Sequence, residues 1–148
     1  MADLTVTLTE SVKLNSSVRG STNTLTIANI DEVVERVVTC TASQTTTIAT
    51  FAASVHTSVQ AIDVNDAKYV RVTNLDSTNP VELAVVGAAT LYQVSLAAGH
   101  SHILGPPDNL MLAEADTSPS FGTMADVASL QVNPGGNAVA VELFIASV

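Results

Sequence analysis

The sequence predicts an all-β protein, an antiparallel β-sandwich or jelly-roll-like single domain, and three observations lead to that prediction. Valine and threonine are abundant while aromatic residues make up only 3% of the chain, and β-branched side chains fit a pleated sheet better than a helix. Apolar and polar residues alternate with period two from end to end. Turn-forming residues separate the alternating segments about every 8 to 12 residues, which is typical of sandwiches and barrels.

The N-terminal third contains the least regular pattern. Residues 4–10 and 23–30 alternate as strands do, and the polar segment 15–22 between them predicts a loop. Residues 30–38 have apolar side chains at helical spacing, so a helix is the alternative there. We favour a strand because the segment is rich in valine and a threonine-rich stretch follows it.

The remaining strands are expected in the second half of the chain. The clearest is 137–148, where Val139, Val141, Leu143 and Ile145 fall on one face. The glycine-rich segment 133–137 before it predicts a hairpin turn. The other segments with strand patterns are 68–75, 81–86, 90–96, 100–104, 110–115 and 127–132.

The chain length favours one domain. A chain of 148 residues can form a single core, and no linker, charge block or low-complexity tract divides it. We expect residues 1–22 to form an N-terminal arm or a first strand, and residues 23–148 to form the β-sandwich domain.

The charge pattern restricts the partners. Only 13% of the residues are charged, against about 25% in an ordinary soluble domain, so we expect much of the surface to be covered by other copies or by a larger assembly. The net charge is -9, and no Lys or Arg follows Arg71. Such a surface repels phosphate, so we expect no direct nucleic-acid partner, whereas a basic partner surface would fit.

Three further features bear on cellular location. Cys40 is the single cysteine, so no intramolecular disulfide points to an oxidising compartment. The N-terminus shows no secretory signal pattern. The most apolar run, residues 83–99, is interrupted by Gly87, Gln93 and Ser95, so we expect no membrane span.

The strongest candidate for chemistry is a pair of histidines. On a strand, His100 and His102 would project from one face about 6.6 Å apart, close enough to reach one metal ion. In the cupin metalloenzymes a Glu follows such a pair within a few residues, but here apolar residues and prolines follow. His56, Glu114 and Asp116 are the substitute ligands. We favour a solvent-facing or interface pair over a metal site, and we expect no cofactor.

Two other groupings are weaker. An oxygen-rich group lacks the dense spacing of a calcium loop, so it predicts a solvated acidic rim. Its members are Asp108, Asn109, Glu114 and Asp116. Cys40 and His56 are the remaining nucleophile and base, but Cys40 lies in a strand pattern, where a buried thiol is the usual explanation. We therefore expect no catalytic residues and no enzyme.

The segments at 2–15, 68–86, 92–104 and 137–148 together resemble the small β-sandwich structural proteins of tailed bacteriophages, in the style of marine podovirus-like virion proteins. The resemblance is strongest to capsid decoration, or cement, proteins. It implies a sandwich subunit that forms a homo-oligomer, with a trimer favoured. It also implies a site on the outside of a capsid or tail, where the major capsid protein or another virion protein is the partner.

The function expected from the residues and the resemblance is therefore structural. We expect a capsid decoration subunit that is assembled in the host cytoplasm, resides in the virion and stabilises the phage head by bridging capsomers. Many weak contacts would then act together. The alternative is a knob, fibre or tail binding module that recognises a host glycan or receptor. A cupin-like metal enzyme is the third class.

Overall fold

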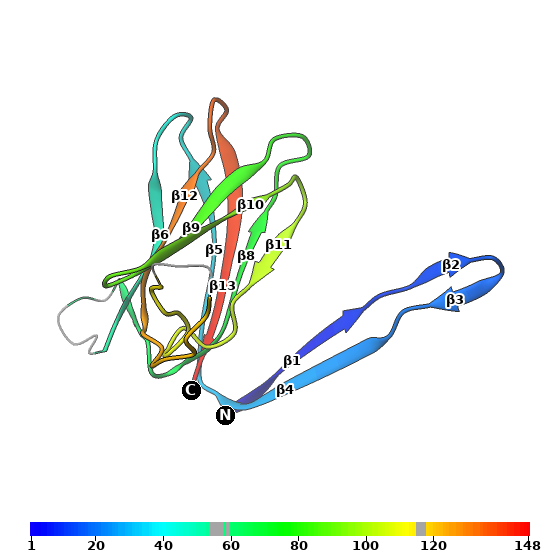
Figure 1. Cartoon of the computed structure of the whole chain (residues 1–148), viewed down its shortest axis with the longest axis horizontal. Coiled ribbons are helices and arrows are strands. Elements are labelled where there is room, and N and C mark those ends of the chain that lie inside the picture. Colours follow the sequence, from blue (N-terminus) through cyan, green and yellow to red (C-terminus); the bar gives the residue numbers. More distant parts are fainter. Residues whose placement is uncertain (54–57, 59, 115–117) are drawn as a thin grey trace.

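The computed structural model describes residues 1–53, 58, 60–114 and 118–148. The described residues form thirteen strands and no helix, and therefore no helix long and apolar enough to cross a membrane. Two sheets pack face to face, and a long hairpin extends from one end of them (Figure 1). The prediction of an all-β antiparallel sandwich is confirmed.

One sheet of the sandwich has five strands and the other has four. The order in the five-stranded sheet is β10-β9-β12-β6-β7, and in the four-stranded sheet it is β11-β8-β13-β5. All pairs are antiparallel except β6 with β7. The strands are β5 (Glu32–Cys40), β6 (Thr46–Ala52), β7 (Ala61–Asp63), β8 (Ala67–Asn74), β9 (Val81–Gly87), β10 (Leu91–Leu96), β11 (Ser101–Ile103), β12 (Val127–Asn133) and β13 (Val139–Ser147).

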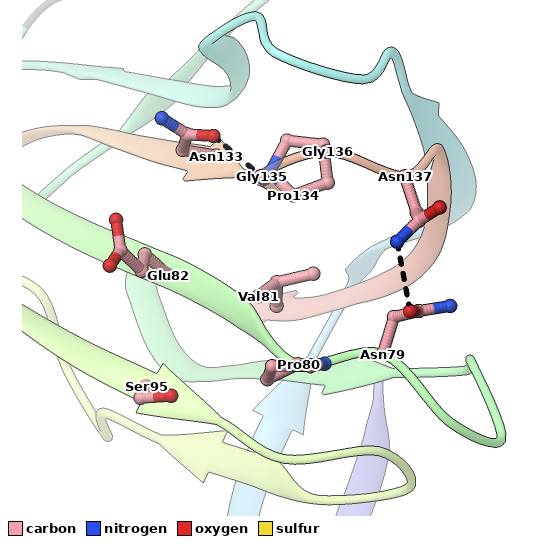
Figure 2. Close-up of a pocket in the computed structure, with 10 residues that line it drawn as sticks. All are labelled: Asn79, Pro80, Val81, Glu82, Ser95, Asn133, Pro134, Gly135, Gly136 and Asn137. Carbon is pink, nitrogen blue, oxygen red and sulfur yellow. Dashed lines mark hydrogen bonds between the residues drawn. The ribbon is translucent and has the colours of Figure 1, made fainter.

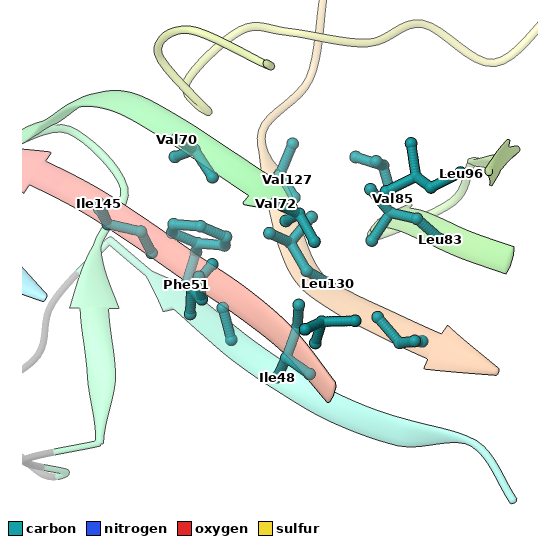
Figure 3. Packing of buried hydrophobic residues seen from close by; sticks show 14 of the residues in the cluster. Ile48, Phe51, Val70, Val72, Leu83, Val85, Leu96, Val127, Leu130 and Ile145 are labelled. Atoms are coloured by element: carbon teal, nitrogen blue, oxygen red, sulfur yellow. The ribbon is translucent and has the colours of Figure 1, made fainter. Parts of the chain in front are cut away.

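The core lies between the two sheets and is built by the period-two alternation (Figure 3). β13 turns Val141, Leu143 and Ile145 inward, and each is fully buried. β9 and β12 of the opposite sheet supply Leu83 and Leu130. Each such side chain contributes about 1.5–3 kcal/mol when it leaves water, so the inward stripes stabilise the sandwich.

The ambiguous segment 30–38 belongs to a strand, as favoured. β5 pairs with β13 along its whole length, from Glu32 opposite Ser147 to Cys40 opposite Val139. Its valines divide between the two faces of the sheet. Val34 and Val38 pack against the core, whereas Val33 and Val37 are exposed on the outer face.

Three local predictions were wrong. Residues 110–115 form no strand in the described positions, where Met111 makes an isolated bridge with Ala125. Residues 133–137 connect β12 to β13, which lie in different sheets, so they close no hairpin within one sheet. The polar segment 15–22 contains a short strand, β3 (Ser17–Arg19), which pairs with β2 (Val12–Leu14).

A buried asparagine ties the loop after β8 to the sandwich. The side-chain amide of Asn74 donates to the carbonyls of Asn79 and Leu96 at 2.9 and 3.1 Å. Its side-chain oxygen accepts from the backbone N–H of Asp76 at 2.9 Å. Because a buried amide without partners costs about 1–3 kcal/mol, this satisfied group specifies the loop conformation.

The N-terminal segment forms the extended hairpin, called the arm below (residues 2–30). β1 (Ala2–Thr9) pairs with β4 (Thr22–Ile30), and β2 with β3 continues the hairpin to its tip. The arm leads away from the sandwich in Figure 1, and only its base lies against the four-stranded sheet. The arm boundary expected at residue 22 falls at the start of β4.

Candidate assembly surface

The arm has two chemically different faces because both of its long strands alternate. Leu4 lies opposite Ile27, and Val6 lies opposite Leu25. Directly opposed residues of an antiparallel pair share a face, so these side chains and that of Leu8 form one apolar face. The other face carries Thr5, Thr7, Thr9, Thr22, Thr24 and Thr26.

Local backbone chemistry lets the arm continue to its tip. Asn15 and Ser16 have φ values of 48° and 64°, which is the conformation of a two-residue turn that matches the twist of a hairpin. Gly20 has a φ of 122°, and a Cβ there would lie 2.0 Å from the carbonyl oxygen of Glu10. Only glycine fits this position.

The base of the apolar face is covered by the chain's own sandwich. Leu4, Val6 and Ile27 are partly buried against a small cluster on the outer face of the four-stranded sheet. In this cluster the rings of Tyr69 and Phe144 meet edge to face, with centroids 6.0 Å apart. These contacts hold the arm at its angle to the sandwich.

Beyond the base the apolar side chains of the arm are uncovered. They are between 53% and 70% exposed, and they are Leu8, Val12, Leu14, Val18 and Leu25. An isolated two-stranded hairpin is marginally stable in water, and clustered exposed apolar residues mark interaction sites. The distal arm therefore has the composition of a surface that is buried in an assembly.

The charge divides between the two parts of the molecule. Residues 1–30 contain Asp3, Glu10, Lys13 and Arg19, whose charges cancel, so the net charge of -9 lies on residues 31–148. Both basic residues of the arm lie in the strands of its tip. A neutral arm with a cationic tip is thus joined to an acidic sandwich.

The two candidate histidines have different surroundings. His102 is half-buried, and its Nε2 lies 3.3 Å from the hydroxyl oxygen of Tyr92. Burial lowers the pKa of His102. His100 is exposed just before β11. No group of three or more His, Cys, Asp or Glu residues able to hold a metal is found in the described part of the chain, and the suggested ligands His56 and Asp116 lie outside it.

The candidate nucleophile Cys40 is buried, and Asn109 and Glu114 of the predicted acidic rim are hydrogen-bonded to nearby residues. Cys40 is fully buried, and burial raises the pKa of its thiol, whereas a nucleophilic cysteine needs the thiolate. The Glu114 carboxylate accepts hydrogen bonds from the hydroxyl and the backbone N–H of Ser120, which lower its pKa. Asp126 accepts from the backbone N–H of Asn109 at 2.9 Å.

A polar pocket of about 330 Å³ lies at one end of the sandwich (Figure 2). Asn79 and Asn137 approach each other across it, with a hydrogen bond of 3.1 Å between their side chains. Glu82 is the charged residue among the ten described residues that line it. The pocket presents amide, hydroxyl and carboxylate groups without a paired nucleophile and base among those residues.

Comparison with known proteins shows a likeness to a solved structure and to no family model or curated protein. No protein-family model matches the chain, and no curated protein matches it. Among solved structures, the chain resembles one reported under the description "Bacillus endospore appendages form a novel family of disulfide-linked pili". The identity is 13%, the alignment covers 77% of this chain and 84% of that chain, and the TM-score is 0.42.

The sequence predicted an arm or a first strand over residues 1–22, but it did not predict that the arm has two different faces. The signal was present, because apolar residues and threonines alternate in 4–9 and again in 22–27. It could not be interpreted without the register, since a shift of one residue would place threonine opposite leucine. The pairing of β1 with β4 supplies that register.

Proposed function

We propose that the chain is a structural, non-enzymatic subunit that assembles with copies of itself through its arm. The observation that carries the proposal is the apolar face of the arm, which the chain's own sandwich covers at the base and leaves exposed toward the tip. A surface of this kind is stable in water when a second molecule covers it.

Apolar burial at the arm offsets part of the cost of association. Burying a fully exposed Val or Leu side chain contributes about 1.5–3 kcal/mol, so Leu8, Val12, Leu14 and Leu25, which are 53% to 61% exposed, contribute about 3–7 kcal/mol together. This range overlaps the lower part of the cost of association, about 4–15 kcal/mol. Repetition of the same contact in a closed oligomer adds stability to each subunit.

At a finer level we propose that this subunit decorates the head of a tailed bacteriophage. The support is the resemblance in sequence pattern to decoration proteins, together with the low content of charged residues. In this role a homo-oligomer, with a trimer favoured, binds the major capsid protein and bridges capsomers in the virion.

The alternative is a virion appendage module that binds a host glycan or receptor. The observation that favours it is the polar pocket of Figure 2, where Asn79, Ser95 and Asn137 offer groups that hydrogen-bond to sugar hydroxyls. A glycan array that yields a ligand lost in Asn137→Ala would support this alternative.

The assembly proposal is tested by measuring the molar mass of the full-length protein by light scattering after gel filtration. We expect the wild type to self-associate and Val12→Ser with Leu14→Ser to weaken association at least about tenfold. Leu75→Ser is the matched control, because it removes a similarly exposed leucine from the loop after β8 and should leave association unchanged. A wild type that is monomeric at all concentrations would overturn the proposal.

The decoration proposal is tested separately by cosedimentation with phage heads. If a major capsid gene lies beside this gene, as the decoration role predicts, the heads are assembled from its product, and we expect saturable binding to them. Absence of such a neighbouring gene together with absence of binding would remove the decoration role and leave the assembly role intact.

A further inference from the structure

A second exposed apolar surface lies on the sandwich, away from the arm. It is a groove of about 490 Å³ between the start of β10 and the loop before β12, called the loop groove below. Leu91, Leu112, Phe121 and Met124 line it, and Glu114 is the acidic residue in its lining. Phe121 is 82% exposed and has a φ of 52°.

The exposure of Phe121 is unfavourable in an isolated molecule. A bulky side chain in the left-handed backbone region costs about 1–2 kcal/mol, and the exposed ring leaves a large apolar area in water. Residues in an unfavourable backbone conformation cluster at binding sites, where the strained conformation positions a side chain for contact with a ligand or partner.

The tip of the arm has the complementary composition. Val12 lies opposite Arg19, and Leu14 lies opposite Ser17, so Val12, Leu14 and Arg19 share one face of the tip. This face presents two apolar side chains and one guanidinium. The loop groove presents apolar side chains and one carboxylate in a part of the sequence that has no Lys or Arg after Arg71.

We propose that the tip of the arm of one copy docks in the loop groove of a second copy. This inference rests on the proposed assembly function and names the two surfaces that meet. Val12 and Leu14 pack against Phe121 and its apolar neighbours, and Arg19 approaches the carboxylate of Glu114. Charge complementarity of this kind gives specificity to a contact whose free energy comes mainly from apolar burial.

The shape of the molecule supports a contact between two copies. The arm leads away from its own sandwich (Figure 1), so its tip is presented to another molecule. Because the tip and the loop groove are different surfaces, the contact is head to tail. Repetition of a head-to-tail contact produces a closed ring when the rotation between copies closes, which is compatible with a trimer.

The competing receptor on the sandwich is the outer face of β5. Val33 and Val37 are exposed there. Glu142, opposite Val37, is already paired with Arg71, whereas Glu35 lies on this face and could also receive Arg19. Exposure favours the loop groove, because Phe121 is 82% exposed whereas Val33 and Val37 are 53% and 61% exposed.

The docking is tested by disulfide trapping between two separately purified variants. Cys40 is fully buried and does not compete. We expect mild oxidation of Leu14→Cys mixed with Phe121→Cys to give a covalent heterodimer. The matched control is Val18→Cys mixed with Phe121→Cys, because Val18 lies opposite Lys13 on the other face of the tip. It should give at least about tenfold less product.

The charge contact is tested by reversal. Arg19→Glu and Glu114→Arg should each weaken self-association about tenfold or more, because each places like charges together. The two changes combined in one chain should restore it. A combined variant as weak as the single variants would overturn the pairing of these two residues.

The outcomes separate the docking site from the proposed function. Leu14→Cys that links to Val37→Cys instead of Phe121→Cys would overturn the loop groove as receptor while the assembly function survives. A wild type that never self-associates would overturn both. A covalent heterodimer from Leu14→Cys mixed with Phe121→Cys, and none from Val18→Cys mixed with Phe121→Cys, would support both the docking site and the assembly function.

Discussion

His102 illustrates how a strand assigns different environments to neighbouring residues. Ser101 and Ile103 line the groove beside the base of the arm, whereas His102 between them contacts Tyr92 of the opposite sheet. The two rings meet edge to face, with centroids 6.1 Å apart. The hydrogen-bonding partner of His102 is a phenol. His102 therefore functions as a packed polar side chain at the edge of the core.

This environment makes stability depend on pH. Burial lowers the pKa of His102, so the folded protein keeps the imidazole neutral where the unfolded chain protonates it, below about pH 6.5. The unfolded state then binds more protons, and the free energy of unfolding falls as the pH drops from about 6.5 through the lowered pKa. We expect urea unfolding to show this decrease in the wild type and a smaller one in His102→Gln.

His100→Gln is the control for this prediction, because it removes an exposed imidazole two residues away. It should retain the wild-type dependence of the unfolding free energy on pH. Identical pH profiles for the wild type and His102→Gln would show that burial of this ring does not affect stability.

At the scale of the element, the arm depends on one glycine. Gly20 lies between β3 and β4, and a Cβ there would overlap the carbonyl of Glu10. We expect Gly20→Ala to disrupt the pairing of β2 with β3 and to accelerate amide hydrogen exchange in both strands at least about tenfold. The thermal midpoint of the sandwich should change by less than about 2 °C, because the arm tip contributes nothing to the core.

Gly136→Ala is the matched control, since nothing lies within 4 Å of the added Cβ. It should leave exchange in the arm unchanged. If Gly20→Ala exchanged as slowly as the wild type in β2 and β3, the close approach to Glu10 would have no role in the arm.

Elements were predictable from the sequence where one face of a strand is buried. The alternation in β9, β12 and β13 comes from inward stripes of Val and Leu, and burial imposes this pattern directly. The pattern fails at residues 110–115, where Leu110 and Met111 pack against the core from a loop. A loop that packs on the core can show the same alternation of apolar and polar residues without pairing with a neighbouring strand. The pattern alone therefore cannot distinguish such a loop from a strand.

The candidate site was less predictable than the fold because it depends on pairing between distant segments. The partition of the arm into an apolar face and a threonine face needs the register of β1 with β4. The loop groove needs Leu91 to approach Phe121 across 30 residues of chain. Composition predicts that part of the surface is covered by other molecules, because so few residues are charged, and this stays a prediction.

At the scale of the whole molecule, the separation of charge predicts how the proposed assembly responds to salt. A cationic arm tip and a sandwich that carries the net charge of -9 attract each other over about 30 Å at 0.01 M salt but about 10 Å at 0.1 M. We expect the association constant from light scattering to fall severalfold over this range. Lys13→Gln with Arg19→Gln should associate more weakly and lose most of the salt dependence. Equal salt dependence in the wild type and this variant would mean that the tip charges take no part in assembly.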